Sequence, residues 1–270
     1  MLYGICNLSI VPLRLETSDN SEMVSQVLFG EHFKVLDKKK NWSKIRIHFD
    51  GCEGYINNKQ FFEISEENYL ELSNSNTTLS GELIDFLIEE NGQLSTIPIG
   101  ATLPFYHNKK VSIGAKKFTF EGTIINKKLD KELLLKTAFL FLNTPHFWGG
   151  KTPFGIDSAG FTQMVYKLCG YQVLRKAKQQ ATQGEVLSFI EESEPGDLAF
   201  FDDNEGVITH VGIIMKDNHI IHAYGKVRID RLDHSGIYNV DTKKTNNLRN
   251  STRYGWNVLL KLFKSKTSVC

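Results

Sequence analysis

Alternating apolar and polar residues dominate the first half of the chain and predict short β-strands. The alternation is most regular between residues 42 and 49, where Ser43, Ile45 and Ile47 fall on one side and Trp42, Lys44 and Arg46 on the other. Such a period of two is typical of a half-buried strand. Apolar stretches at 24–29, 33–36 and 54–56, separated by turn residues, complete the pattern. Residues 1–66 are therefore expected to form a small barrel of short strands.

Residues 67–128 repeat this pattern more loosely after a polar loop at 74–78. Strands are expected at 83–90, 93–97, 101–106 and 117–122, with turns at Asn91-Gly92 and at Asn108. We interpret this stretch as a second small β-barrel.

At Asp130 the apolar period changes from two to that of a helix. Asp130 is a plausible N-cap, and Thr144-Pro145 is the expected end of this helix. A second helix is expected at 159–168, followed by strands at 198–201, 207–215, 219–224 and 227–229. Helices followed by an antiparallel sheet predict an α+β domain over residues 129–250. The extension at 251–270 could be a partner-binding helix, an extra strand or a disordered tail.

Composition narrows the class of protein further. The 270 residues carry a net charge of +1, which argues against binding nucleic acid through bulk charge. The sequence has no stretch of the roughly 18 apolar residues that a membrane span needs. Because residues 1–6 lack a basic start and an apolar core, no secretory signal is expected, and we predict a cytoplasmic protein.

The four cysteines are widely spaced, at Cys6, Cys52, Cys169 and Cys270. No Cys-x-x-Cys pair occurs, so neither a zinc site nor a redox motif is expected. Four cysteines are also too few for a disulfide scaffold in a chain of this length. We predict reduced thiols, the first three of them mostly buried, and no cofactor or metal.

One group of residues could carry chemistry. Ser158 follows a glycine-rich loop and stands at the start of a helix, where backbone N–H groups and the helix dipole can hold an oxyanion. His210 and His222 lie on two strands joined by a short turn, so they can meet side by side. A nucleophile, a base and an orienting group form a catalytic triad.

Simpler interpretations of the same residues stay open. Ser158 could be only a helix cap, and the two histidines could be ordinary core or surface residues. His219 and His222 could be metal ligands, but residues three apart in a strand point to opposite faces.

Motifs in residues 131–248 resemble the NlpC-type family of bacterial cell-wall peptidases, whose fold is papain-like. They occur in the family's order and spacing, at Trp148-Gly149-Gly150, Phe154-Gly155-Ile156-Asp157, Gly160-Phe161-Thr162-Gln163, Pro195-Gly196-Asp197-Leu198, Thr209-His210-Val211-Gly212-Ile213 and Ile221-His222-Ala223. Residues 1–128 resemble the paired bacterial SH3-like barrels that precede this domain in one subgroup. That subgroup resembles endopeptidases that cut between γ-D-glutamate and a diamino acid, which implies a murein-derived peptide as ligand.

The resemblance assigns catalytic positions to Ser158, His210 and His222, and substrate-binding positions to Asp157, His146, Lys176 and Ala159. Three of these positions depart from the family pattern. Ser158 stands where the family has its nucleophilic cysteine, and His146 stands where it has a tyrosine. Lys176 replaces an aspartate that holds the free amine of the substrate.

Three functions compete. The departures favour a catalytically impaired or inactive protein that binds a peptide. The alternative is a working hydrolase of cell-wall peptides that uses Ser158, His210 and His222. A third hypothesis makes the two barrels a ligand-binding or wall-binding module. The oligomeric state is open.

Overall fold

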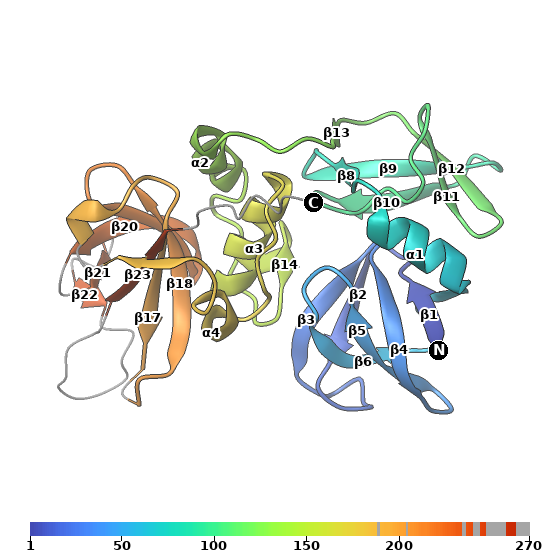
Figure 1. The fold of residues 1–270 in the computed structure, drawn as a ribbon, viewed down its shortest axis with the longest axis horizontal. Helices are drawn as coiled ribbons and strands as arrows, with labels where there is room; N and C mark the ends of the chain where they lie inside the picture. Colours follow the sequence, from blue (N-terminus) through green and yellow to red (C-terminus); the bar gives the residue numbers. More distant parts are fainter. Residues whose placement is uncertain (188–189, 204, 234–235, 240–243, 247–257, 263–270) are drawn as a thin grey trace. The chain divides into compact units, whose positions relative to one another are not determined.

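The computed structural model describes residues 1–187, 190–203, 205–233, 236–239, 244–246 and 258–262, and Figure 1 shows their fold. The chain forms two compact units. The N-terminal unit comprises residues 1–128 and Trp148–Pro153, and the C-terminal unit comprises Leu129–Phe147 and the residues from Phe154 onward.

A seven-stranded antiparallel sheet forms the first part of the N-terminal unit. The strand order is β3-β2-β6-β5-β4-β1-β7, and the strands are β1 (Leu2–Ile5), β2 (Ile10–Arg14), β3 (Met23–Leu28), β4 (His32–Lys38), β5 (Trp42–Ile47), β6 (Glu53–Asn57) and β7 (Phe62–Ile64). Ser43, Ile45 and Ile47 of β5 are buried, which confirms the face expected from the alternation.

The second part of this unit contains a four-stranded sheet in the order β10-β9-β12-β11 and a separate pair, β13-β8. The elements are α1 (Glu66–Asn74), β8 (Leu79–Ser80), β9 (Ile84–Glu89), β10 (Leu94–Pro98), β11 (Lys110–Ile113), β12 (Lys116–Phe120) and β13 (Ile124–Ile125). The expected strand at 101–106 is wrong, because this segment makes only an isolated bridge at Thr102 while Ala101 and Leu103 fill the core as a loop.

The sequence pattern missed helix α1. Ser65 caps it by accepting a hydrogen bond from the Asn68 backbone N–H, and only Tyr69 and Leu72 of the helix are buried. Two buried residues leave a weak apolar period, so the pattern was dominated by the polar residues around them.

The two β-rich parts share a core. Ile5 and Phe29 from the seven-stranded sheet belong to the same buried cluster as Leu87, Ile97 and Phe118 of the four-stranded sheet. Because the two sheets bury apolar side chains against one another, residues 1–128 form part of one compact unit.

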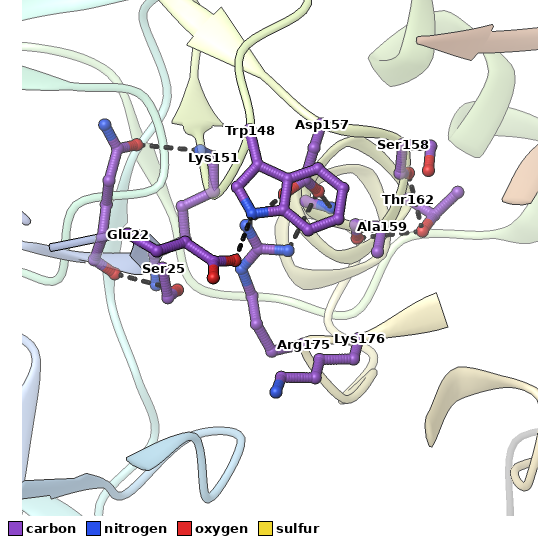
Figure 2. A network of polar contacts seen from close by, with 12 residues as sticks. Glu22, Ser25, Trp148, Lys151, Asp157, Ser158, Ala159, Thr162, Arg175 and Lys176 are labelled. Atoms are coloured by element: carbon purple, nitrogen blue, oxygen red, sulfur yellow. Dashed lines mark hydrogen bonds and ion pairs between the residues drawn. The ribbon is translucent and has the colours of Figure 1, made fainter. Parts of the chain in front are cut away.

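The segment Trp148–Pro153, which contains β14 (Lys151–Thr152), belongs to the N-terminal unit rather than to the stretch 129–250 in which it was predicted. The Lys151 ammonium donates to both carboxylate oxygens of Glu31 at 2.9 Å, and both side chains are almost fully buried, at 1% and 2% exposure. Trp148 donates from its indole N–H to Glu22 at 2.7 Å, as Figure 2 shows. Gly149 has φ +75°, and a Cβ on it would lie 2.1 Å from the Met23 carbonyl oxygen.

The C-terminal unit is an eight-stranded sheet with helices on one side, as expected for an α+β fold (Figure 1). The order is β16-β23-β17-β18-β19-β20-β21-β22. The strands are β15 (Gly155–Ile156), which lies outside this sheet, β16 (Glu185–Leu187), β17 (Leu198–Asp202), β18 (Ile208–Met215), β19 (His219–Tyr224), β20 (Lys226–Asp233), β21 (Gly236–Asn239), β22 (Lys244–Asn246) and β23 (Val258–Leu262). The helices are α2 (Lys131–Phe139), α3 (Ser158–Leu168), α4 (Ala177–Gln180) and the 3-10 turn Ile190–Glu192.

Two boundaries in this unit differ from the sequence prediction. Helix α2 ends at Phe139 rather than near Thr144, and Asn143 in the following turn has φ +68°. Within the extension at 251–270, Val258–Leu262 pairs with both β16 and β17, so the extra-strand alternative is confirmed for these residues. The remainder of that extension lies outside the described residues.

Cys6, Cys52 and Cys169 are buried free thiols, as predicted, and Cys270 lies outside the described residues. Among the described residues, no group of three or more His, Cys, Asp or Glu side chains could hold a metal ion. No described helix is long and apolar enough to cross a membrane.

Candidate functional site

The turn before α3 holds Ser158 as the first residue of the helix. Asp157, not Ser158, is the N-cap, and its carboxylate accepts a hydrogen bond from the Gly160 N–H at 2.6 Å. The interpretation of Ser158 as a plain helix cap is therefore wrong. Its side chain lies at the positive end of the helix dipole and is nearly buried.

Asp157 also pairs with Arg175. The guanidinium donates to both carboxylate oxygens, at 3.0 and 2.7 Å, and the Arg175 side chain is buried (Figure 2). This bidentate ion pair holds the segment before α4 against the start of α3. The carboxylate of Asp157 thus has two partners within the protein, Gly160 and Arg175. Its predicted role in binding substrate stays a prediction.

The first turn of α3 is also held by Gln180 of α4. Gln180 is fully buried; its side chain accepts from the Thr162 hydroxyl at 2.7 Å and donates to the Ala159 carbonyl at 2.8 Å. The Ala159 backbone oxygen is thus engaged within the protein. Lys176, at the start of α4, has an exposed side chain, and its backbone N–H donates to Gln179 at 3.2 Å.

The two histidines meet on neighbouring strands. His222 of β19 lies opposite Gly212 of β18, and His210 lies two residues before Gly212 on the same face. Nε2 of His210 is 2.8 Å from Nδ1 of His222, and the rings are nearly perpendicular, at 87°. Both side chains are buried, so the dyad predicted from the hairpin forms.

A carboxylate extends this pair, and the sequence prediction missed it. Nε2 of His222 is 3.1 Å from Oδ2 of Asp230, which lies fully buried on β20. Arg228 on the same strand donates to both oxygens of Asp230, at 2.7 and 2.9 Å. The predicted strand ended at Ile229, one residue before Asp230, whereas β20 continues to Asp233. Nothing in the local pattern singles out Asp230, because charged residues recur along the whole of β20, from Lys226 to Asp233.

Burial governs the protonation of both histidines. It lowers the pKa of His210 well below 6.5, and the nearby His222 and His146 lower it further. Burial also lowers the pKa of His222, against the opposing effect of the Asp230 carboxylate. Both imidazoles are therefore neutral near pH 7.

Helix α3 packs on β18 and β19, so the element that begins at Ser158 contacts both histidine strands. His146 is exposed, and its backbone N–H donates to the Gly225 carbonyl at 2.9 Å. The catalytic assignment of Ser158, His210 and His222 stays a prediction.

Comparison with known proteins identifies the class. Residues 143–245 match the NlpC/P60 family, and residues 13–61 match the bacterial dipeptidyl-peptidase Sh3 domain. The chain therefore contains an NlpC/P60 domain preceded by a bacterial SH3 domain, as the sequence motifs indicated.

Several known proteins are similar to this chain over most of its length. The chain is 25% identical over 229 residues to a gamma-D-glutamyl-L-lysine dipeptidyl-peptidase of Bacillus subtilis, covering 78% of this chain and 75% of that protein. It is 26% identical over 235 residues to a protein of the same name from Bacillus cereus, covering 78% and 70%. The solved structure of an NlpC/P60 family protein from Bacillus cereus has a TM-score of 0.75 at 21% identity, covering 86% of this chain and 94% of that one. This last likeness supports the fold.

Proposed function

We propose that this protein binds murein-derived peptides in its NlpC/P60 domain and cleaves them slowly or not at all. The observation that carries the proposal is the combination of Ser158 at the nucleophile position with a buried His210 whose pKa is lowered well below 6.5. The peptide class follows from the names of the two Bacillus relatives.

The chemistry of a hydroxyl differs from that of a thiol at this position. A cysteine has a pKa near 8.5, and a helix N-terminus and a cationic neighbour lower it, so the attacking thiolate exists before the reaction begins. A serine must lose its proton to a base during attack. His210 is a weak base, because its burial disfavours the imidazolium that would form.

The other departures from the family pattern support the same proposal. The resemblance puts an aspartate that binds the substrate amine at the position of Lys176, whose exposed ammonium would repel such an amine. It also puts a tyrosine hydroxyl at the position of His146. These changes would weaken the hold on the substrate amine and remove an active-site hydroxyl, which fits slow or absent cleavage.

A specific observation favours the alternative, a working serine hydrolase. The row from His210 through His222 to Asp230 is complete, with contacts of 2.8 and 3.1 Å. A carboxylate at the end of such a row stabilises the imidazolium that forms during serine attack.

The deciding experiment compares wild type with Ser158→Cys and His210→Ala on a peptide that contains a γ-D-glutamyl-L-lysine bond. We expect calorimetry to show binding by wild type, and release of lysine to stay at the level of the His210→Ala variant. Turnover by wild type that His210→Ala abolishes would support the hydrolase instead. A higher cleavage rate in Ser158→Cys would show that the serine alone limits cleavage. An unchanged rate would show that the other altered positions, His146 and Lys176, also prevent cleavage.

We further propose that the protein acts in the cytoplasm on freed peptides, which cell fractionation would test.

The hypothesis that the barrels alone bind a ligand is best tested on the full chain, because a fragment ending at residue 128 would remove Lys151 from Glu31. Ligand contacts mapped by cross-linking to residues 1–128 would support that hypothesis.

A further inference from the structure

A row of polar side chains crosses the C-terminal sheet from β18 to β21. It consists of His210, His222, Asp230, Arg228 and Asn239, which are linked by consecutive hydrogen bonds. The strand register explains the row: Arg228 lies opposite His222, and Asp230 lies opposite Ile220, so all these side chains share one face. The row is closed from solvent at its centre, where Asp230 is fully buried.

Arg228 determines the charge of Asp230. A guanidinium has only donors and stays protonated, and it points Nε and Nη2 at Oδ2 and Oδ1 of the carboxylate, at 2.7 and 2.9 Å. Arg228 itself is oriented by a further bond from Nη2 to Oδ1 of Asn239 at 2.8 Å. Hydrogen bonds to the charged form and a cation at this distance favour the ionised carboxylate.

An ionised carboxylate can only accept, so the contact between Asp230 and Nε2 of His222 requires a proton on that nitrogen. A neutral imidazole carries one proton, which leaves Nδ1 of His222 as an acceptor. Nε2 of His210 lies 2.8 Å from this acceptor and must therefore be the donor. The remaining ring nitrogen of His210, Nδ1, is then unprotonated.

We infer that Asp230 is a positioning residue that fixes both histidines as their Nε2–H tautomers and thereby presents the lone pair of His210 Nδ1 as a hydrogen-bond acceptor. This inference goes beyond the proposed function, since it holds whether a peptide is cut or only bound. A group that donates a hydrogen bond, such as a hydroxyl or a peptide N–H, is the partner that this nitrogen can take.

Long-range proton–nitrogen NMR of the full chain reads the tautomers directly. The chain has eight histidines, so His210→Gln and His222→Gln spectra identify the two signals. In wild type near pH 7.5 we expect both rings to carry the proton on Nε2. A wild-type spectrum with the proton on Nδ1 of His222 would overturn the inference, and this reading needs no variant at Asp230.

Asp230→Ala tests the cause. Oδ2 of Asp230 accepts from both Arg228 Nε and His222 Nε2, so removing the carboxylate leaves His222 without the acceptor that holds its proton on Nε2. We expect the Nε2–H form to lose its preference, so that both rings show a share of the Nδ1–H tautomer. Asp233→Ala is the matched control, since it makes the same change at an exposed position of β20 and should leave both tautomers unchanged. A folded Asp230→Ala protein whose two rings keep the proton on Nε2 alone would contradict the assigned role of Asp230.

Discussion

Gly212 lies directly opposite His222 across the β18–β19 pair, and the absence of a side chain there makes room for the imidazole. A Cβ on Gly212 would lie 2.9 Å from the Cβ of His222 and 2.6 Å from Cδ1 of Ile220. The position of His222, and with it the contact between His222 and His210, therefore depends on Gly212.

Gly212→Ala should displace His222 and destabilise the C-terminal unit. Forcing a methyl group into such a site costs about 1–3 kcal/mol. Urea unfolding measures the loss, and the NMR signals of His210 and His222 should shift with it. Gly81→Ala is a milder control in the other unit, because its nearest contact would be 3.0 Å, and it should leave the histidine signals unchanged. An unaltered His222 signal in Gly212→Ala would contradict this packing argument.

Removing one partner of the Lys151–Glu31 pair should destabilise the N-terminal unit strongly. Both side chains are buried, and a charge left in the interior without its partner costs about 3–5 kcal/mol. We expect this loss for Lys151→Met, measured by urea unfolding. The double variant Lys151→Met with Glu31→Leu should recover much of it, since no buried charge remains.

The exposed pair of Lys38 and Glu63 is the control for this experiment. Their side chains are 47% and 48% exposed, so Lys38→Met should change stability by less than about 1 kcal/mol. Equal losses for Lys151→Met and Lys38→Met would show that burial of the ion pair does not set its contribution.

Stability should fall as the pH drops below about 6.5, because the buried histidines resist protonation in the folded state. The pKa values of His210 and His222 are lowered by burial, so below pH 6.5 the unfolded chain binds more protons than the folded one. Urea unfolding at pH 7.5 and 5.5 should show the loss, and it should be smaller in His210→Gln. His48→Gln should reduce it less, because the side chain of His48 is exposed and its pKa is lowered less far. An identical pH dependence of stability in wild type and His210→Gln would contradict the lowered pKa of His210.

Asp157 should contribute to stability both as a helix cap and as the partner of Arg175. Asp157→Asn keeps an oxygen that can accept from the Gly160 N–H, whereas Asp157→Ala removes it. We expect Asp157→Ala to be less stable than Asp157→Asn by at least about 1 kcal/mol, the typical contribution of a cap, because alanine also removes the oxygen to which Arg175 Nη1 donates. Thermal unfolding of the two variants measures the difference, and equal stability would mean that the cap contributes little.

The native thiols should resist alkylation. Cys6 is fully buried, and burial raises the pKa of its thiol to about 12, while burial also raises the pKa of Cys169. Iodoacetamide at pH 7.5 should leave Cys6, Cys52 and Cys169 unmodified until urea unfolds the protein, as peptide mass spectrometry can show. In Ser158→Cys the new thiol at the helix N-terminus should react first. Modification of Cys6 in the folded protein would contradict its burial.

Local pattern was sufficient for much of the fold. The alternation at 42–49, the change of period at Asp130 and the hairpin at 208–224 predicted elements that form, because each depends on residues that are neighbours in the sequence. The motif spacing around Ser158, His210 and His222 was also sufficient to indicate the NlpC/P60 domain.

The sequence by itself thus determined most of the strands and helices, though not α1, together with the NlpC/P60 motifs and the pairing of His210 with His222. Only the tertiary structure decided that Asp157 rather than Ser158 caps α3, that Asp230 completes the histidine row, and that Lys151 is buried against Glu31. The physical reason is that a buried charge is stable only beside its partner, and these partners are brought together by the fold from positions that no local pattern connects. The separation of 120 residues between Lys151 and Glu31 shows how far such a pairing lies from any local signal.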